Sequence, residues 1–76
     1  MEELIEILEE IKPGVDFEKA DNLVEGGVLA SFDILRLVNE LNNAFDIEIT
    51  PLHIIPENFK NAKAIWALVE KLQDED

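Results

Sequence analysis

A chain of 76 residues is long enough for one domain, and 47% hydrophobic residues are enough for one compact core. Little material remains for a substrate cleft of roughly 300–1,000 Å³, so a self-contained enzyme is not expected. The absence of cysteine excludes disulfides, thiolate metal sites and thiol nucleophiles. Eighteen acidic and six basic residues give a net charge of −12, which disfavours binding to nucleic acid or to an anionic membrane.

The apolar runs and the first residues of the chain bear on where the protein is expected to be located. No apolar run approaches the roughly 20 residues of a membrane-spanning helix. Met1-Glu2-Glu3 places acid where a secretory signal carries positive charge. We therefore expect a soluble, cytoplasmic protein made of a single domain, residues 1–76.

The first predicted helix runs from about Glu2 to Lys12 and ends at Pro13-Gly14. Its apolar residues repeat with a helical period, at Leu4, Ile5, Leu8 and Ile11. The loop that follows, from Pro13 to Ala30, is unusually long for so small a domain. We expect apolar side chains of this loop to hold it against the core, namely Val15, Phe17, Leu23, Val24, Val28 and Leu29.

The second predicted helix runs from about Ser31 to Phe45. Its apolar stripe consists of Ile34, Val38, Leu41 and Phe45, widened by Leu35 and Leu37. Residues 46–50 alternate like a strand but have no partner strand, which predicts an extended connector with Ile47 and Ile49 inward. Pro56 is expected to start a short helical turn through Phe59. The last helix runs from about Asn61 to Leu72, with Ala62, Ile65, Trp66, Val69 and Leu72 inward.

Ser31 is the main candidate functional residue, because it opens the second helix after Gly26-Gly27. One interpretation makes it only an N-cap, whose side chain pairs with a free backbone N–H group. The other makes its hydroxyl the attachment point of a phosphate-linked group, which would face the positive end of the helix dipole. The two interpretations are compatible, since both need the same exposed position.

The segment from Leu29 to Leu35, followed by Leu41 to Ile49, resembles the core of acyl carrier proteins. In that family a long loop leads to an Asp-Ser-Leu-like triplet at the start of the second helix. That helix then ends in a Glu-Phe-(Asp/Gly)-Ile-Glu-Ile-like segment. Pro56 to Phe59 and the last helix resemble the family's third and fourth helices. The resemblance covers nearly the whole chain and implies an all-α, four-helix carrier bundle, with three longer helices and one short one.

The resemblance implies a 4′-phosphopantetheine arm attached through the Oγ atom of Ser31. The terminal thiol of the arm would carry an acyl or aminoacyl group as a thioester, so the chain needs no cysteine of its own. The implied partners are a phosphopantetheinyl transferase, the enzymes that load the arm, and downstream enzymes of fatty-acid, polyketide or peptide biosynthesis. A triplet with phenylalanine, here Phe32, also occurs in carriers of the D-alanyl type. The protein is expected to be a monomer without catalytic or metal-binding residues.

Two departures from the family pattern are visible. Ala30 stands where the family usually has Asp, a residue that helps to place the metal and the serine in the transferase complex, so the resemblance implies slow modification or none. The second helix is also less acidic than usual, with Arg36 beside Asp33 and Glu40. We expect Phe32, Asp33, Arg36 and Glu40 to dock partner enzymes, and a partner set different from that of general fatty-acid carriers.

Two other classes of function are compatible with parts of the sequence. Ala30 is compatible with an unmodified helical interaction module that uses Ser31 and Phe32 only for binding. A hydrolase with a Ser31–His53–acid triad lacks the Gly-x-Ser-x-Gly elbow and the chain length to build a site. His53, the only histidine, is therefore expected to have a structural or solvent-facing role.

Overall fold

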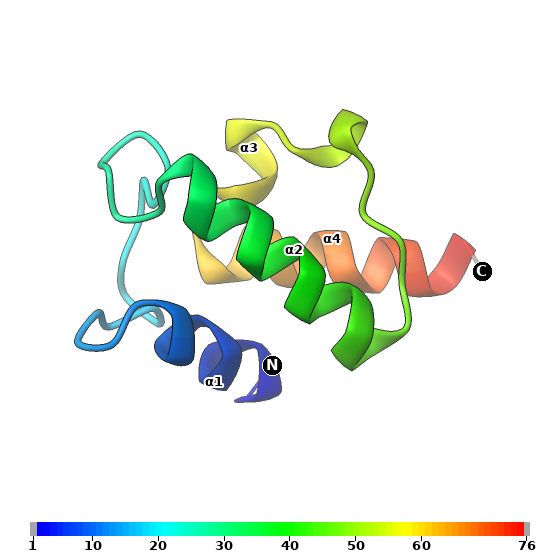
Figure 1. The fold of residues 1–76 in the computed structure, drawn as a ribbon, viewed down its shortest axis with the longest axis horizontal. Coiled ribbons are helices and arrows are strands. Elements are labelled where there is room, and N and C mark those ends of the chain that lie inside the picture. Colours follow the sequence, from blue (N-terminus) through cyan, green and yellow to red (C-terminus); the bar gives the residue numbers. More distant parts are fainter. Residues whose placement is uncertain (1, 76) are drawn as a thin grey trace.

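The computed structural model describes residues 2–75 and contains only helices and loops in that range. The α-helices are α1 (Glu2–Ile11), α2 (Ser31–Phe45), α3 (Pro56–Phe59) and α4 (Ala62–Glu75). A short 3-10 helix, η1 (Pro51–His53), precedes α3. Three of the α-helices are long and α3 is a single turn, and the longest loop joins α1 to α2 (Figure 1). This arrangement confirms the predicted four-helix, all-α fold.

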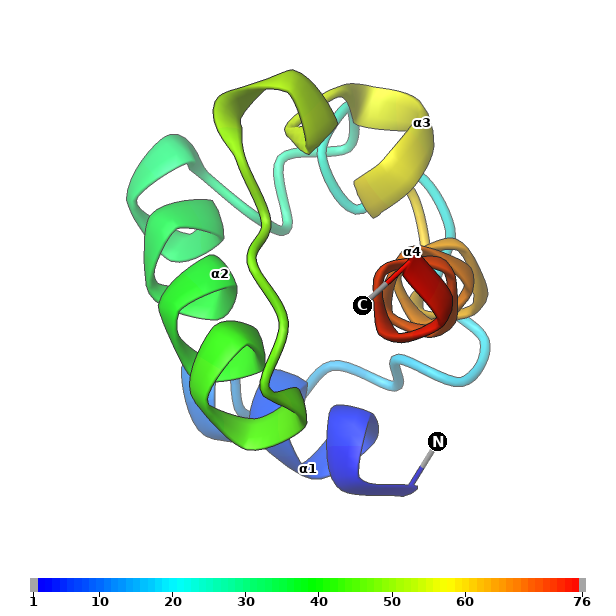
Figure 2. The same ribbon diagram turned by 90° about the vertical axis from the view of Figure 1, so that its right-hand side faces the viewer.

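The three long helices surround one hydrophobic core. Figure 2 looks along α4 and shows α1 and α2 on other sides of the bundle. Both α1 and α2 pack against α4 and against each other. Each long helix contributes an apolar face, so none could bury that face alone. The molecule measures 33 × 23 × 19 Å.

The loop between α1 and α2 is packed by its own side chains. Phe17, Leu23 and Leu29 are buried in the core, as predicted, and the three loop valines are half-buried against it. The backbone N–H of Leu23 donates to the Lys60 carbonyl at 2.8 Å, which ties the loop to the region between α3 and α4. These contacts hold the loop against the core and thereby fix the position of the start of α2.

The inward faces differ from the predicted stripes at a few positions. On α2, Ile34, Leu37 and Leu41 are buried, but Leu35 is 63% exposed, so its prediction as a core residue was wrong. Leu35 lies about 100° around the helix from Ile34, on a side of α2 that the described residues leave open to solvent. The predicted stripes also omitted Ile7 and Leu68, which are buried, whereas Ile5, Val38, Phe45 and Trp66 are only half-buried.

The connector after α2 follows the prediction in part. Residues 47–50 form neither helix nor strand, and Thr50 has extended backbone angles (φ −101°, ψ 167°). Ile49 is buried and Ile47 is half-buried, as expected. The helix η1 was not predicted, since three residues give no periodic signal. The last helix begins at Ala62, where the Asn61 side chain accepts from the Ala64 N–H at 2.7 Å, and it continues beyond Leu72. None of the described helices is long and apolar enough to cross a membrane.

Candidate functional site

Ser31 occupies the first helical position of α2 and is exposed. The N-cap is Ala30, whose extended backbone (φ −82°, ψ 170°) turns the loop into the helix. The prediction of Ser31 as the N-cap was therefore wrong by one position. A methyl group cannot accept a hydrogen bond, so Ala30 leaves the first-turn N–H groups without a side-chain cap.

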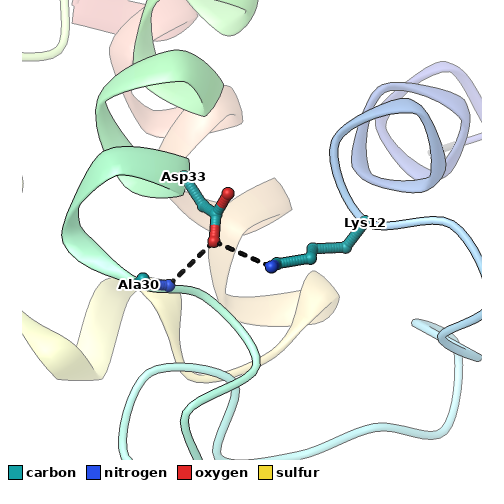
Figure 3. Close-up of polar contacts among 3 residues, drawn as sticks. All are labelled: Lys12, Ala30 and Asp33. Carbon is teal, nitrogen blue, oxygen red and sulfur yellow. Dashed lines mark hydrogen bonds and ion pairs between the residues drawn. The ribbon is translucent and has the colours of Figure 1, made fainter.

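Asp33 makes a different side-chain contact at the same end of α2 (Figure 3). Its Oδ2 atom accepts the backbone N–H of Ala30 at 3.1 Å. The same oxygen lies 3.3 Å from Nζ of Lys12, one residue beyond the end of α1. One half of a capping box is thus present, because the third helical residue reaches back to the N-cap, while Ala30 cannot supply the other half.

These contacts set the charge state of Asp33. The N–H of Ala30 lowers the pKa of the Asp33 carboxyl below its ordinary value, and Lys12 and Arg36 act in the same direction. Partial desolvation opposes them but does not prevail. The Asp33 side chain is 17% exposed and that of Lys12 is 42% exposed. The carboxylate is therefore anionic at neutral pH and faces a cation of its own chain.

The four predicted docking residues all lie on α2 but differ in exposure. Phe32 is 78% exposed and Arg36 is exposed, whereas Asp33 and Glu40 are half-buried. Phe32 and Arg36 are one helical turn apart, as are Arg36 and Glu40, so they can share one side of the helix.

Within residues 2–75, three further large apolar side chains are exposed, and they were not among the predicted docking residues. They are Leu35, Leu52 and Ile55. Leu35 lies three positions after Phe32, a spacing that could have indicated a shared exposed face. Leu52 belongs to η1, which the sequence did not reveal.

His53 makes hydrogen bonds with its side chain and with its backbone carbonyl between α2 and α3. Its Nδ1 atom accepts the Thr50 N–H at 3.0 Å and lies 3.1 Å from the Thr50 hydroxyl. Its carbonyl accepts from the Asn58 side chain at 2.8 Å. Within residues 2–75 no hydrogen bond joins His53 to Ser31, so the two do not form a catalytic pair in this structure. The expectation of a structural role for His53 agrees with these contacts.

The geometry around Ser31 is compatible with a bulky phosphate-linked substituent. The side chain is exposed, so a long arm meets no steric barrier at its point of attachment. The helix it opens is 15 residues long, and its uncapped N–H groups favour an anion at this end. The residues present therefore fit a phosphodiester on Ser31.

The second helix of this four-helix bundle therefore begins with an exposed serine. No protein-family model matches the chain. A D-alanyl carrier protein of Lactococcus lactis subsp. lactis (strain IL1403) is 33% identical over 78 residues, covering 99% of this chain and 98% of the relative. Two D-alanyl carrier proteins of Lactococcus lactis subsp. cremoris, from strains MG1363 and SK11, are 35% identical over the same length. The chain belongs to the D-alanyl carrier protein family.

Proposed function

We propose that this protein is a carrier that holds an aminoacyl or acyl group on a 4′-phosphopantetheine arm attached to Ser31. The observation that carries the proposal is the exposed hydroxyl on the first turn of α2. It lies in a chain that aligns over nearly its full length with D-alanyl carrier proteins. An amino acid such as D-alanine is the favoured cargo, because the relatives are named for it.

The attachment requires one hydroxyl and one pyrophosphate bond. The Oγ atom of Ser31 forms a bond to the phosphorus that bears the pantetheine arm of coenzyme A. The pyrophosphate P–O bond breaks, 3′,5′-adenosine bisphosphate leaves, and the hydroxyl proton passes to a base. When bound, the arm supplies a terminal thiol that carries the cargo as a thioester. The chain itself catalyses no step in this role.

The protein itself contributes by presenting the tethered cargo to partner enzymes. A tether on an exposed helix end keeps the cargo at a high effective concentration near each docked enzyme. Exposed Phe32 adjoins Ser31, and exposed Arg36 lies one helical turn further along α2. They provide an apolar and a charged contact for those enzymes. The net charge of −12 steers the carrier towards basic docking surfaces.

The test is modification with coenzyme A and a broad-specificity phosphopantetheinyl transferase, followed by intact-mass analysis and peptide mapping. We expect the gain of one phosphopantetheine group, located on Ser31, and no gain in a Ser31→Ala variant. Thr50 carries the only other aliphatic hydroxyl of the chain and is the internal control. Ala30→Asp should increase the rate, because it restores the residue that carriers usually have before the serine.

The alternative is an unmodified helical module that binds partners through the same corner. Ala30 favours this alternative, since the Asp that carriers usually have before the serine is missing. Modification at Thr50, or no modification even in the Ala30→Asp variant, would refute the carrier proposal and leave the binding module.

A further inference from the structure

A three-part polar contact joins the end of α1 to the first turn of α2. Lys12 and Asp33 are 21 positions apart, and the long loop lies between them. The Asp33 Oδ2 atom is shared between the Lys12 ammonium at 3.3 Å and the Ala30 N–H at 3.1 Å (Figure 3). This is the one ion pair that the described residues contain. It lies beside the residue that the proposed modification uses.

The contact acts on the backbone on both sides of Ser31. Asp33 is two residues after Ser31, and Ala30 is immediately before it. An ordinary N-cap side chain would hold this turn through the first N–H groups of the helix, but Ala30 has no acceptor. The Asp33 carboxylate bridges the turn instead, and Lys12 restrains that carboxylate from outside the helix. Preorganisation of a reacting group by such supporting contacts lowers the cost of reaching the reactive geometry.

We propose that Lys12 and Asp33 are positioning residues for the modification of Ser31, and that their contact with the Ala30 N–H holds the serine turn in place of an N-cap side chain. The inference rests on the proposed carrier function. It assigns a role in modification to Lys12, which lies 19 positions before Ser31 in the sequence, just beyond the end of α1.

A competing role for Asp33 predicts the opposite effect of removing Lys12. If Asp33 acted mainly as a carboxylate that a basic transferase binds, Lys12 would mask it. Loss of Lys12 would then expose the charge, lower KM for the carrier and speed modification. If Lys12 and Asp33 position the serine turn, loss of Lys12 slows modification, and the loss appears in kcat rather than in KM.

The experiment measures kcat and KM of a broad-specificity phosphopantetheinyl transferase, with coenzyme A, on the parent chain and on variants. Lys12→Met keeps the length of the side chain and removes its charge, and Lys71→Met makes the same change on the exposed side of α4. We expect Lys12→Met to reduce kcat by about two- to fivefold at unchanged KM, in the range that an exposed ion pair can supply. Lys71→Met should leave kcat unchanged. Lys12→Arg, which keeps the positive charge, should also have a kcat close to that of the parent.

An independent readout follows the contact itself. In ¹H–¹⁵N spectra of the unmodified chain, the Ala30 amide should shift as Asp33 is protonated at low pH, and the shift should be absent in Asp33→Asn. Lys12→Met should alter the Ala30 amide resonance, whereas Lys71→Met should not. The urea midpoints of both lysine variants should stay close to that of the parent, which separates positioning from loss of fold.

The outcomes distinguish the inference from the function on which it rests. Absence of modification at Ser31 in both the parent chain and the Ala30→Asp variant refutes the carrier function and the positioning role together. Modification of the Ala30→Asp variant but not of the parent refutes the positioning role alone, because the contact then does not replace an N-cap side chain. A modified parent whose rate is unchanged or increased by Lys12→Met refutes the positioning role alone. A rise in KM without a change in kcat would make Lys12 part of the docking surface and would also overturn the inference.

Discussion

Replacement of Phe32 by Ala tests whether the corner next to Ser31 is a surface for partners or part of the core. Phe32 is 78% exposed, so about a fifth of its surface is removed from water. Full burial of a phenylalanine side chain contributes about 1.5–3 kcal/mol, so the buried fraction here contributes only about 0.3–0.7 kcal/mol. Alanine also favours the helix more than phenylalanine does, by a few tenths of a kcal/mol. The net cost of Phe32→Ala should therefore be below about 0.5 kcal/mol.

Two other phenylalanines serve as references. Phe59 is fully buried, and Phe59→Ala should cost about 3–5 kcal/mol, as is usual for core truncations. That is a large part of the stability expected for 76 residues, roughly 4–11 kcal/mol. Phe45 is half-buried and meets Trp66 edge to face, with ring centroids 5.5 Å apart and planes at 73°. Phe45→Ala should fall between the two, at about 1.5–3 kcal/mol.

Urea melts of the three variants give the free energies of unfolding, and thermal melts give a second measure. Phe32→Ala should shift Tm by less than about 4 °C, since about 1 kcal/mol corresponds to 4–8 °C in a domain of this size. The same variant should slow transfer of cargo from a cognate loading enzyme, because exposed aromatic anchors concentrate interface energy. If Phe32→Ala destabilises the chain as much as Phe59→Ala, α2 is rotated from its described position and the docking surface is wrong.

Substitutions at three further positions test local contacts. Ala30→Asp should stabilise the folded chain by about 0.5–1.5 kcal/mol, because it supplies an N-cap acceptor to α2. Thermal melts measure this gain, and a Tm no higher than that of the parent would show that repulsion from Asp33 outweighs the cap. The pKa of Asp33 is lower in the folded than in the unfolded chain. The parent should therefore be more stable than Asp33→Asn by a constant free energy of unfolding at pH values above the unfolded pKa, about 3.9. In a series of urea melts, this difference in stability should vanish as the pH falls through the folded pKa. His53→Gln should retain most of the stability of the parent, because Gln can still accept a hydrogen bond from the Thr50 N–H. His53→Leu should lose about 1 kcal/mol, because Leu cannot accept that bond. Equal urea midpoints for the two variants would mean that this bond contributes nothing to stability.

Much of the secondary structure could be predicted because it depends on local patterns. The helical period of apolar residues from Ser31 to Phe45 and the Pro13-Gly14 stop predict α2 and the end of α1 to within a residue. Pro56 predicts the start of α3 for the same kind of reason, since its backbone angle suits a first helical position. The exposed serine at the start of α2 also follows from its place before that periodic segment.

Other features depend on which surfaces meet in space. Leu35 and Leu37 look equally suited to the core, yet Leu37 is buried and Leu35 is 63% exposed, because neighbouring elements cover only one side of α2. Periodicity fixes the angle between two side chains but not the width of the buried face. The helix η1 escaped prediction because three residues carry no period.

The candidate site also combines features that the sequence predicts with features that depend on the tertiary structure. The sequence by itself determined that Ser31 begins a helix, that the residue before it has no cap acceptor, and that the chain is strongly acidic. It did not reveal that Ala30 rather than Ser31 is the cap, which depends on the backbone angles at the loop–helix junction. Only the tertiary structure brings Lys12 to Asp33, 21 positions away. The fold of the intervening loop decides that contact, because Phe17, Leu23 and Leu29 anchor the loop in the core and thereby set the end of α1 beside the start of α2.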